Sequence, residues 1–283
     1  FKRMKKILVV CDLSKKKILD SIVGLKPWFE KHVSIEIVDL SKEKYIEKTG
    51  AEIAVVFGGD GAILSTCRKL GRNQIPIVGV HMGRFGFLAE LMEKDVCVSL
   101  EKIFTGNYHV RKRTLLLCRV ERAGKIIDES TGINDAVISR SSLSRLISIK
   151  LNINGENVAT YRADGLIVST PLGSTAHSLS AGGPLLTPDL HAFIIVPICP
   201  HTLTNRPLVV SGDVKIEMEL LSQLGGTGFT VDGQVFTELE MGDKIKIERS
   251  DIEVQMIDTG TRTFYGVLRE KLNWGGQPNY GRN

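Results

Sequence analysis

The stretch IAVVFGGDG, residues 53–61, decides the fold class that we expect for this chain. Its first five residues are apolar and three of them are β-branched, a pattern typical of a strand buried on both faces. Three glycines and Asp60 follow, and residues 62–70 have a helical pattern. A strand, a glycine-rich turn and a helix bring backbone N–H groups up to a phosphate, because glycine permits close approach and a helix N-terminus carries partial positive charge. Asp60 is the residue to explain, since a carboxylate repels phosphate unless a metal ion or the chemistry requires it.

Two common nucleotide-binding motifs do not fit this loop. The dinucleotide fingerprint G-x-G-x-x-G would need glycine at position 64, where Leu64 stands, and the Gly-Lys-Ser/Thr triplet of a P-loop occurs nowhere in the chain. The tetrapeptide Gly58–Gly61 instead resembles the loop of the NAD kinase, diacylglycerol kinase and phosphofructokinase group, in which the Asp lies beside the phosphoryl-transfer site. A tight turn in which Asp60 caps the following helix is the alternative interpretation.

Strands alternate with helices over about the first 105 residues, which indicates a doubly wound parallel sheet. Strands are expected at 6–11, 33–38, 53–57 and 75–80, with helices over 18–29 and 62–70. Ligands of such sheets collect at the carboxyl ends of the strands, where the Gly58–Gly61 loop falls. The turn Gly83–Gly86 follows another strand of this sheet and should lie near the same crevice.

The pattern changes after Gly106, where strands follow one another without long helices between them. These strands are expected at 114–121, 136–140, 146–153, 165–170, 208–210, 214–221, 244–248 and 252–256. One short helix is expected after Thr175, and residues 263–272 are expected to form a strand and then a helical turn. We therefore predict an α/β N-terminal domain with a doubly wound parallel sheet over 1–106 and a mostly β, sandwich-like C-terminal domain over 107–262. A last segment, 263–283, would pack back on the first domain.

Composition limits the classes of partner. The net charge is +5, from 37 basic and 32 acidic residues, a mild excess that suits an anionic small molecule and gives little support for nucleic acid. Five scattered cysteines without a C-x-x-C pair indicate a reducing cytoplasm and no structural zinc. The longest apolar run, near residues 192–199, is too short to cross a bilayer, and the basic start lacks a signal-peptide core. We therefore expect no membrane partner.

The run PLGSTAHSLSAGGP, residues 171–184, carries the resemblance to one family. It places hydroxyls and small residues at the start of a short helix, and it resembles the stretch GSTAYSLSAGGP that is a hallmark of NAD kinases. Further matches to that family are ND at 134–135, RADG at 162–165, PHTL at 200–203, RPL at 206–208, VDGQ at 231–234 and LREKLNW at 268–274. The resemblance extends over nearly the whole chain, from about residue 5 to 274.

The resemblance to the NAD kinase family implies a role for each matching position. Asp60 would accept the proton of the 2′-hydroxyl of the adenosine ribose, with Gly61 beside that sugar. Further positions would contact the dinucleotide or a phosphate, and these are Asn134, Asp135, Arg145, Arg162, Asp164, Thr175, Ala176, His177, Ser178, Leu179, Ser180 and Gln234. Mg²⁺ would arrive with ATP rather than on a protein metal site, and relatives that complete their sites across subunits imply a homodimer or homotetramer.

Two residues depart from the family pattern. His177 stands where most relatives carry a hydroxyl-bearing aromatic residue, which stacks on the base. An imidazole offers less stacking area than that residue, and it carries charge below about pH 6.5. Asp135 is one methylene shorter than the usual Glu. These departures predict an altered affinity rather than another substrate. Four other histidines, His32, His81, His109 and His191, have no partner pattern and are expected to be structural or exposed.

The leading prediction is an ATP-dependent kinase that converts NAD into NADP. One alternative is a lipid kinase of the diacylglycerol kinase type, which would need an apolar pocket, whereas residues 175–180 are small and mostly polar. Another alternative is a non-catalytic dinucleotide sensor, against which Asp60 argues. Assays with NAD or diacylglycerol as acceptor separate these three functions.

Overall fold

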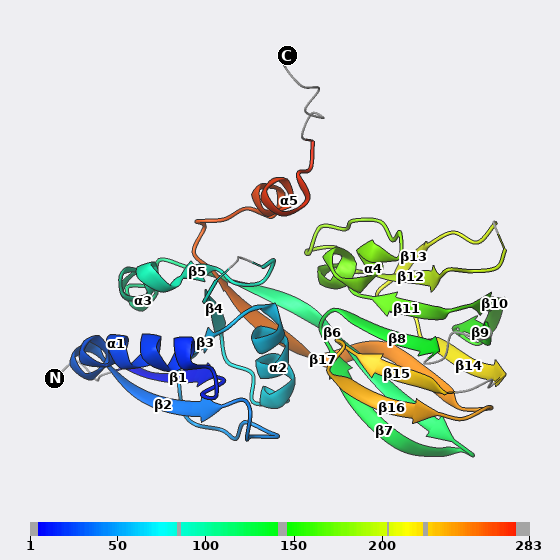
Figure 1. Cartoon of the computed structure of the whole chain (residues 1–283), viewed down its shortest axis with the longest axis horizontal. Helices are drawn as coiled ribbons and strands as arrows, with labels where there is room; N and C mark the ends of the chain where they lie inside the picture. The colour runs from blue at the N-terminus through cyan, green and yellow to red at the C-terminus, as the bar shows by residue number, and fades with distance from the viewer. Residues whose placement is uncertain (1–4, 84–85, 141–145, 203, 223–225, 276–283) are drawn as a thin grey trace. The chain divides into compact units, whose positions relative to one another are not determined.

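The computed structural model describes residues 5–83, 86–140, 146–202, 204–222 and 226–275. The chain divides into two compact units (Figure 1), the first formed by residues 1–112 and 254–283 and the second by residues 113–253. Both unit boundaries fall inside long strands, which are β6 (His109–Arg122) and β17 (Lys244–Asp258). Each unit has its own buried apolar core.

The first unit contains a parallel sheet. Its other elements are β1 (Lys5–Cys11), α1 (Lys16–His32), β2 (Val33–Asp39), β3 (Ile53–Phe57), α2 (Asp60–Leu70), β4 (Ile77–His81), β5 (Leu91–Met92), the 3₁₀ turn η1 (Glu93–Asp95), α3 (Val96–Phe104) and α5 (Phe264–Leu272). The strands lie in the order β4-β3-β1-β2 with parallel ladders throughout. β5 also pairs with β4 in parallel, as does the end of β17, where Met256 lies opposite Ile77.

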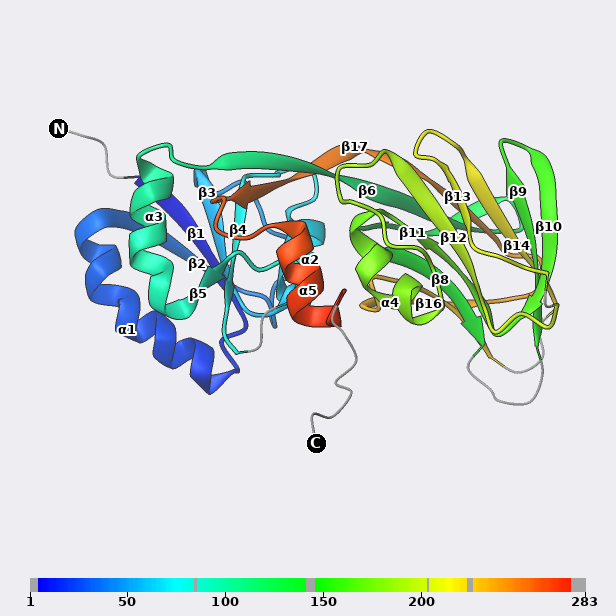
Figure 2. The same ribbon diagram turned by 90° about the horizontal axis from the view of Figure 1, so that it is seen from above.

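Helices cover both faces of this parallel sheet. α1 and α3 share a buried cluster with Val55 of β3 and with Val78 and Val80 of β4. Gly79 points to the other face, where a Cβ would lie 2.4 Å from Cδ1 of Ile63 in α2. Figure 2 shows α1 and α3 side by side and apart from α2. The doubly wound α/β arrangement predicted from the sequence is therefore confirmed.

The second unit is built from antiparallel strands in two sheets. Its remaining elements are β7 (Lys125–Gly132), β8 (Asp135–Arg140), β9 (Ile147–Ile153), β10 (Glu156–Ala163), β11 (Gly165–Ser169), η2 (Leu172–Thr175), α4 (His177–Ser180), β12 (Ala192–Ile198), β13 (Leu208–Ser211), β14 (Ile216–Ser222), β15 (Thr227–Val231) and β16 (Val235–Leu239). One sheet has the order β13-β12-β11-β8-β15-β16, and the other includes β10-β9-β14-β17. Alternate residues of both sheets, such as Ile138, Leu166, Ile149 and Met218, share one core, which confirms the sandwich-like β arrangement.

The prediction of a strand and a helical turn over residues 263–272 is wrong. These residues form the helix α5, in which Thr263 caps the N-terminus by accepting a hydrogen bond from the Gly266 backbone N–H at 3.1 Å. Val267 and Leu268 are buried, and Asn273 ends the helix in a left-handed conformation with φ 50°. The aromatic and β-branched residues of this segment favour a strand, but the two capping residues stabilise a helix instead.

The described helices are short. α1 is the longest of them, with 17 residues, and it buries Ile18, Ile22 and Phe29 along one face. Charged residues occupy much of its opposite face. Among the described residues, no helix combines the length and the apolar character that crossing a membrane requires.

Candidate functional site

Asp60 begins α2 directly after the glycine turn. Its Oδ2 accepts a hydrogen bond from the backbone N–H of Phe87 at 2.8 Å, and its Oδ1 accepts one from the N–H of Leu88 at 3.1 Å. Gly59 occupies the N-cap position of α2 without a side-chain capping bond. The alternative in which Asp60 caps the helix is therefore wrong, because its carboxylate is held by a segment 27 and 28 residues further along the chain.

Gly86 lies directly against this carboxylate. A Cβ on Gly86 would be 2.1 Å from Oδ1 of Asp60 and 2.3 Å from Oδ2, so only glycine fits without displacing the carboxylate. This contact confirms that the end of the turn after β4 lies beside the Gly58–Gly61 loop, which follows the carboxyl end of β3. Gly61, the next residue of α2, is exposed there.

His81, at the end of β4, belongs to the surroundings of Asp60. Burial lowers the pKa of its imidazole below the ordinary value of 6.5. The charges of Lys271 and Arg262 also lower this pKa, whereas the Gly83 backbone and the Asp60 charge oppose the shift. The ring is therefore neutral at pH 7. His81 was expected to be structural or exposed, and its side chain is buried, which agrees with the first alternative. Its electrostatic interaction with the Asp60 carboxylate was not predicted.

Asp232 organises the corresponding region of the second unit. It lies in the turn between β15 and β16 with φ 52°. Its Oδ1 accepts hydrogen bonds from the backbone N–H groups of Ile133 at 3.1 Å, Asn134 at 2.8 Å and Asp135 at 3.3 Å. Its own N–H donates to the Asp135 carbonyl at 2.8 Å. These bonds fix the backbone that presents Asn134 and Asp135, a role that sequence analysis missed because it selected only Gln234 from this motif.

Asp135 is buried, with 4% of its surface exposed, and the backbone N–H of His177 donates to its carboxylate. Burial raises the pKa of Asp135 to about 7, and the Asp232 charge adds to this rise, whereas the His177 N–H opposes it. The carboxyl group is therefore partly protonated at neutral pH. It can either donate or accept a hydrogen bond.

Asn134 presents a buried amide oxygen. Among the described residues, its Oδ1 has no hydrogen-bond partner. Its backbone carbonyl accepts bonds from the Ser169 hydroxyl at 3.0 Å and the Thr170 N–H at 2.9 Å. A Cβ on Gly173 would lie 2.1 Å from that carbonyl oxygen, so glycine permits the η2 turn to pack there. A buried polar atom without a partner is uncommon, and here it is consistent with a ligand contact.

The residues from 175 to 180 lie beside Asp135, through the His177 N–H. Thr175 and Ala176 are half-buried, the His177 side chain is exposed, and Ser178 is fully buried. The remaining two predicted positions of this run are the half-buried Leu179 and the exposed Ser180. An exposed imidazole at the start of α4 can stack on a flat ring, as the sequence prediction requires.

Other predicted positions lie elsewhere in the second unit. Asp135 pairs with Ser169 at one end of β11, whereas Asp164 precedes Gly165 at the other end. Asp164 lies five residues before Ser169, which corresponds to about 17 Å at 3.3 Å per residue. Asp164 forms an ion pair with Arg140, with 2.7 Å between Oδ1 and Nε. The structure does not bring Asp164 together with Asn134 and Asp135 within one chain.

The three remaining predicted positions are Arg162, Gln234 and Arg145. The Arg162 side chain is exposed on β10, next to Ala163 and Asp164. Gln234 is exposed in the turn that contains Asp232, and its N–H donates to the Val231 carbonyl at 3.0 Å. Arg145 lies outside the described residues.

The chain matches two family models. The ATP-NAD kinase N-terminal domain matches residues 21–108, and the ATP-NAD kinase C-terminal domain matches residues 133–259. The chain belongs to the ATP-NAD kinase family. The N-terminal match includes Asp60, and the C-terminal match includes every other predicted contact residue except Gly61.

Individual relatives agree with the family assignment. The chain is 41% identical over 254 residues to the NAD kinase of Geotalea daltonii, with 89% of each chain covered. It is 37% identical over 281 residues to the NAD kinase of Geobacter metallireducens, covering 96% of this chain and 99% of the relative.

Solved structures show the same fold. The crystal structure of a yeast NADH kinase complexed with NADH superposes with a TM-score of 0.88 at 20% identity, covering 99% of this chain and 91% of that one. An NAD kinase from Archaeoglobus fulgidus in complex with ATP has a TM-score of 0.76 at 26% identity, covering 96% of this chain and 100% of that one. The overall architecture is therefore that of NAD kinases.

Proposed function

We propose that this chain is an ATP-dependent NAD kinase, which transfers the γ-phosphoryl group of ATP to the 2′-hydroxyl of the adenosine ribose of NAD. The observation that carries the proposal is the Asp60 carboxylate, held at the first turn of α2 by the N–H groups of Phe87 and Leu88. Family membership supplies the class of reaction. The carboxylate supplies an acceptor of fixed orientation for the hydroxyl proton.

Asp60 would act on the attacking hydroxyl. The ribose oxygen forms a bond to the γ-phosphorus, the bond from that phosphorus to the β–γ bridging oxygen breaks, and ADP leaves with its electron pair. The hydroxyl proton passes to Asp60 as the new O–P bond forms. Because the backbone N–H groups fix the carboxylate before substrate arrives, most of its contribution is orientation together with late proton acceptance.

The second unit would bind the dinucleotide. The Asn134 amide oxygen has no hydrogen-bond partner within the described part of the chain, and it and the Asp135 carboxyl suit ribose hydroxyls and amide groups. The exposed His177 ring and the small residues Thr175 and Ala176 suit a flat base. Asp232 would act on the ligand indirectly, by holding the backbone of Asn134 and Asp135.

A complete site would draw residues from more than one copy of the chain. Asp164 and Arg162 lie at the opposite end of β11 from Asp135, and we assign these two ends to different binding sites of an oligomer. In a homodimer or homotetramer, the Asp164 end of one subunit would face the Asp135 end of another. One dinucleotide could then contact the predicted residues at both ends. Oligomers with closed symmetry are the common arrangement that brings such ends together.

Mg²⁺ would accompany ATP. The described residues contain no group of three or more His, Cys, Asp or Glu side chains that could hold a metal ion. Mg²⁺ is usually bound by substrate phosphates, waters and one or two carboxylates, so the ATP phosphates would supply most of its ligands. The bound ion would offset charge on the transferring phosphoryl group. The five cysteines are free thiols, consistent with a reducing compartment such as the cytoplasm.

The experiment that tests the proposal supplies ATP, Mg²⁺ and one acceptor at a time. NADP formed from NAD supports the kinase function. Product from diacylglycerol would support a lipid kinase, which the small, mostly polar residues 175–180 do not favour. Dinucleotide binding without any product would support a sensor.

A further inference from the structure

The segment 86–90 connects Asp60 to a distant part of the chain within the first unit. Its Phe87 and Leu88 N–H groups hold the Asp60 carboxylate. Its next two residues, Ala89 and Glu90, face the residues that follow β17. The same five-residue segment therefore has the catalytic carboxylate on one side and the chain after β17 on the other.

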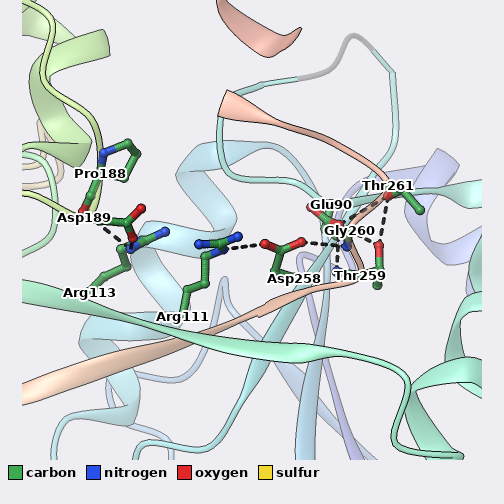
Figure 3. A network of polar contacts seen from close by, with 9 residues as sticks. All are labelled: Glu90, Arg111, Arg113, Pro188, Asp189, Asp258, Thr259, Gly260 and Thr261. Carbon is green, nitrogen blue, oxygen red and sulfur yellow. Dashed lines mark hydrogen bonds and ion pairs between the residues drawn. The ribbon is translucent and has the colours of Figure 1, made fainter. Parts of the chain in front are cut away.

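Glu90 makes the larger share of this second set of contacts. Its Oε1 accepts hydrogen bonds from the Thr259 backbone N–H at 2.9 Å, the Thr259 hydroxyl at 2.6 Å and the Thr261 hydroxyl at 3.2 Å (Figure 3). The Glu90 N–H also donates to the Gly79 carbonyl of β4 at 3.1 Å. Glu90 is thus tied to β4 by its backbone and to residues 259–261 by its side chain.

Arg262 makes the other contact. Its Nη1 donates to the Ala89 carbonyl at 3.2 Å, and its Nη2 donates to Glu270 of α5 at 3.0 Å. The Arg262 side chain is only 16% exposed. Asp258 shapes the turn between these contacts, since it accepts the Gly260 N–H at 2.7 Å and pairs with Arg111 (Figure 3).

We infer that Glu90 and Arg262 are positioning residues for the Asp60 carboxylate, acting through the segment 86–90. The hydrogen bonds at the two ends of this segment have different functions. The N–H groups of Phe87 and Leu88 orient the carboxylate. The Ala89 carbonyl and the Glu90 side chain hold the segment in place. A shift of about 1 Å in a positioning group is enough to lower turnover by about 100-fold. The inference rests on the proposed kinase function of Asp60.

The first test compares Glu90→Ala with Glu90→Gln. The alanine variant loses all three side-chain acceptor contacts, whereas glutamine retains an oxygen that can accept them. We expect kcat to fall by about 10- to 100-fold in Glu90→Ala with little change in the KM for NAD, and to recover largely in Glu90→Gln. Glu101→Ala, at an exposed position of α3, is the matched control and should leave both constants unchanged.

A double-mutant cycle decides whether Glu90 acts through Asp60. Glu90→Ala should lower kcat in the wild-type background and have little further effect in an Asp60→Asn background, because the carboxylate that it positions is already gone. Equal fold losses in both backgrounds would overturn the inference. Unchanged kcat in both Glu90→Ala and Arg262→Ala would overturn it as well. If Glu90→Ala does not fold, Thr259→Val removes one hydroxyl donor and serves as the milder variant.

Amide hydrogen exchange supplies a readout that does not need activity. Exchange at Phe87 and Leu88 should become faster in Glu90→Ala and in Arg262→Ala, and should stay slow in Glu101→Ala. Unchanged exchange in the first two variants would overturn the inference. A wild-type chain that forms no NADP would instead overturn the proposed function, and the exchange measurement would still report whether Glu90 and Arg262 hold the segment.

Discussion

The Asp232 carboxylate accepts the backbone N–H of Asn134 at 2.8 Å, across 98 residues of sequence. The same carboxylate also binds the N–H groups of Ile133 and Asp135. The residues that would contact the dinucleotide are therefore presented by a backbone that another carboxylate holds in place. The first unit uses the reverse arrangement, in which backbone N–H groups hold the carboxylate of Asp60.

Replacing Asp232 tests this relationship. Asp232→Ala leaves three backbone N–H groups without their acceptor, and we expect the free energy of unfolding to fall by about 2–3 kcal/mol, with weaker NAD binding. Asp232→Asn keeps one acceptor oxygen and tolerates the positive φ, so it should lose less. Denaturant unfolding and NAD titration measure both effects. Equal stability of the alanine variant and the wild type would contradict the role assigned to Asp232.

The buried Asp135 predicts a pH dependence of stability. Its pKa is raised from 3.8 to about 7 in the folded protein, so between these values the folded state keeps a proton that the unfolded state releases. The stability contributed by this group is therefore full below pH 3.8, falls as the pH rises to about 7, and then stays constant.

Asp135→Asn removes this titration, so the comparison with the wild type isolates it. The unfolding free energy of the wild type relative to Asp135→Asn should fall by up to about 4 kcal/mol between pH 4 and pH 8. Denaturant unfolding at a series of pH values measures the difference. A difference that does not change with pH would show that Asp135 titrates normally.

We expect alanine substitutions at Gly86 and Gly83 to have very different effects on kcat. A Cβ in Gly86→Ala would collide with the Asp60 carboxylate at 2.1 Å, so we expect kcat to fall by about 100-fold while NAD still binds. A Cβ on Gly83 meets nothing within 4 Å, which makes Gly83→Ala the matched control. Steady-state kinetics on both variants tests this prediction. Similar kcat values in the two variants would mean that the carboxylate position near Gly86 does not matter for turnover.

The proposed sharing of the site between subunits predicts complementation. Asp60→Asn and Asp164→Ala should each be nearly inactive as separate preparations. After mixing and subunit exchange, activity should rise to as much as about a quarter of the wild-type value, because mixed oligomers contain some sites without either substitution. Activity that never exceeds the average of the two separate variants would contradict the sharing.

Local patterns were sufficient to predict the elements that are set by neighbouring residues. The buried strand Ile53–Phe57 with its glycine turn predicted the parallel sheet and the position of Asp60 at one end of it. The prediction was wrong for α5, where strand-forming residues indicated a strand. The structure has a helix there, with Thr263 at its N-cap and Asn273 at its C-cap.

Long-range contacts explain what sequence analysis missed in the site. Asp232 precedes a glycine after a strand, a pattern typical of an ordinary turn, and its N–H donors lie about 100 residues away. His81 carries no local signal of its proximity to Asp60. Motif matching also cannot tell which end of a strand a residue occupies. Only the antiparallel register of β11 with β8 separates Asp164 from Asp135.

The most direct test of the account is single-turnover phosphoryl transfer from ATP to NAD by the Asp60→Asn variant. Asp20→Asn, an exposed carboxylate of α1, is the control for the same change in charge. We predict that Asp60→Asn binds NAD normally and transfers the phosphoryl group at least ~100-fold more slowly than the wild type, while Asp20→Asn matches the wild type. Near-normal transfer by Asp60→Asn would contradict the catalytic role of this carboxylate.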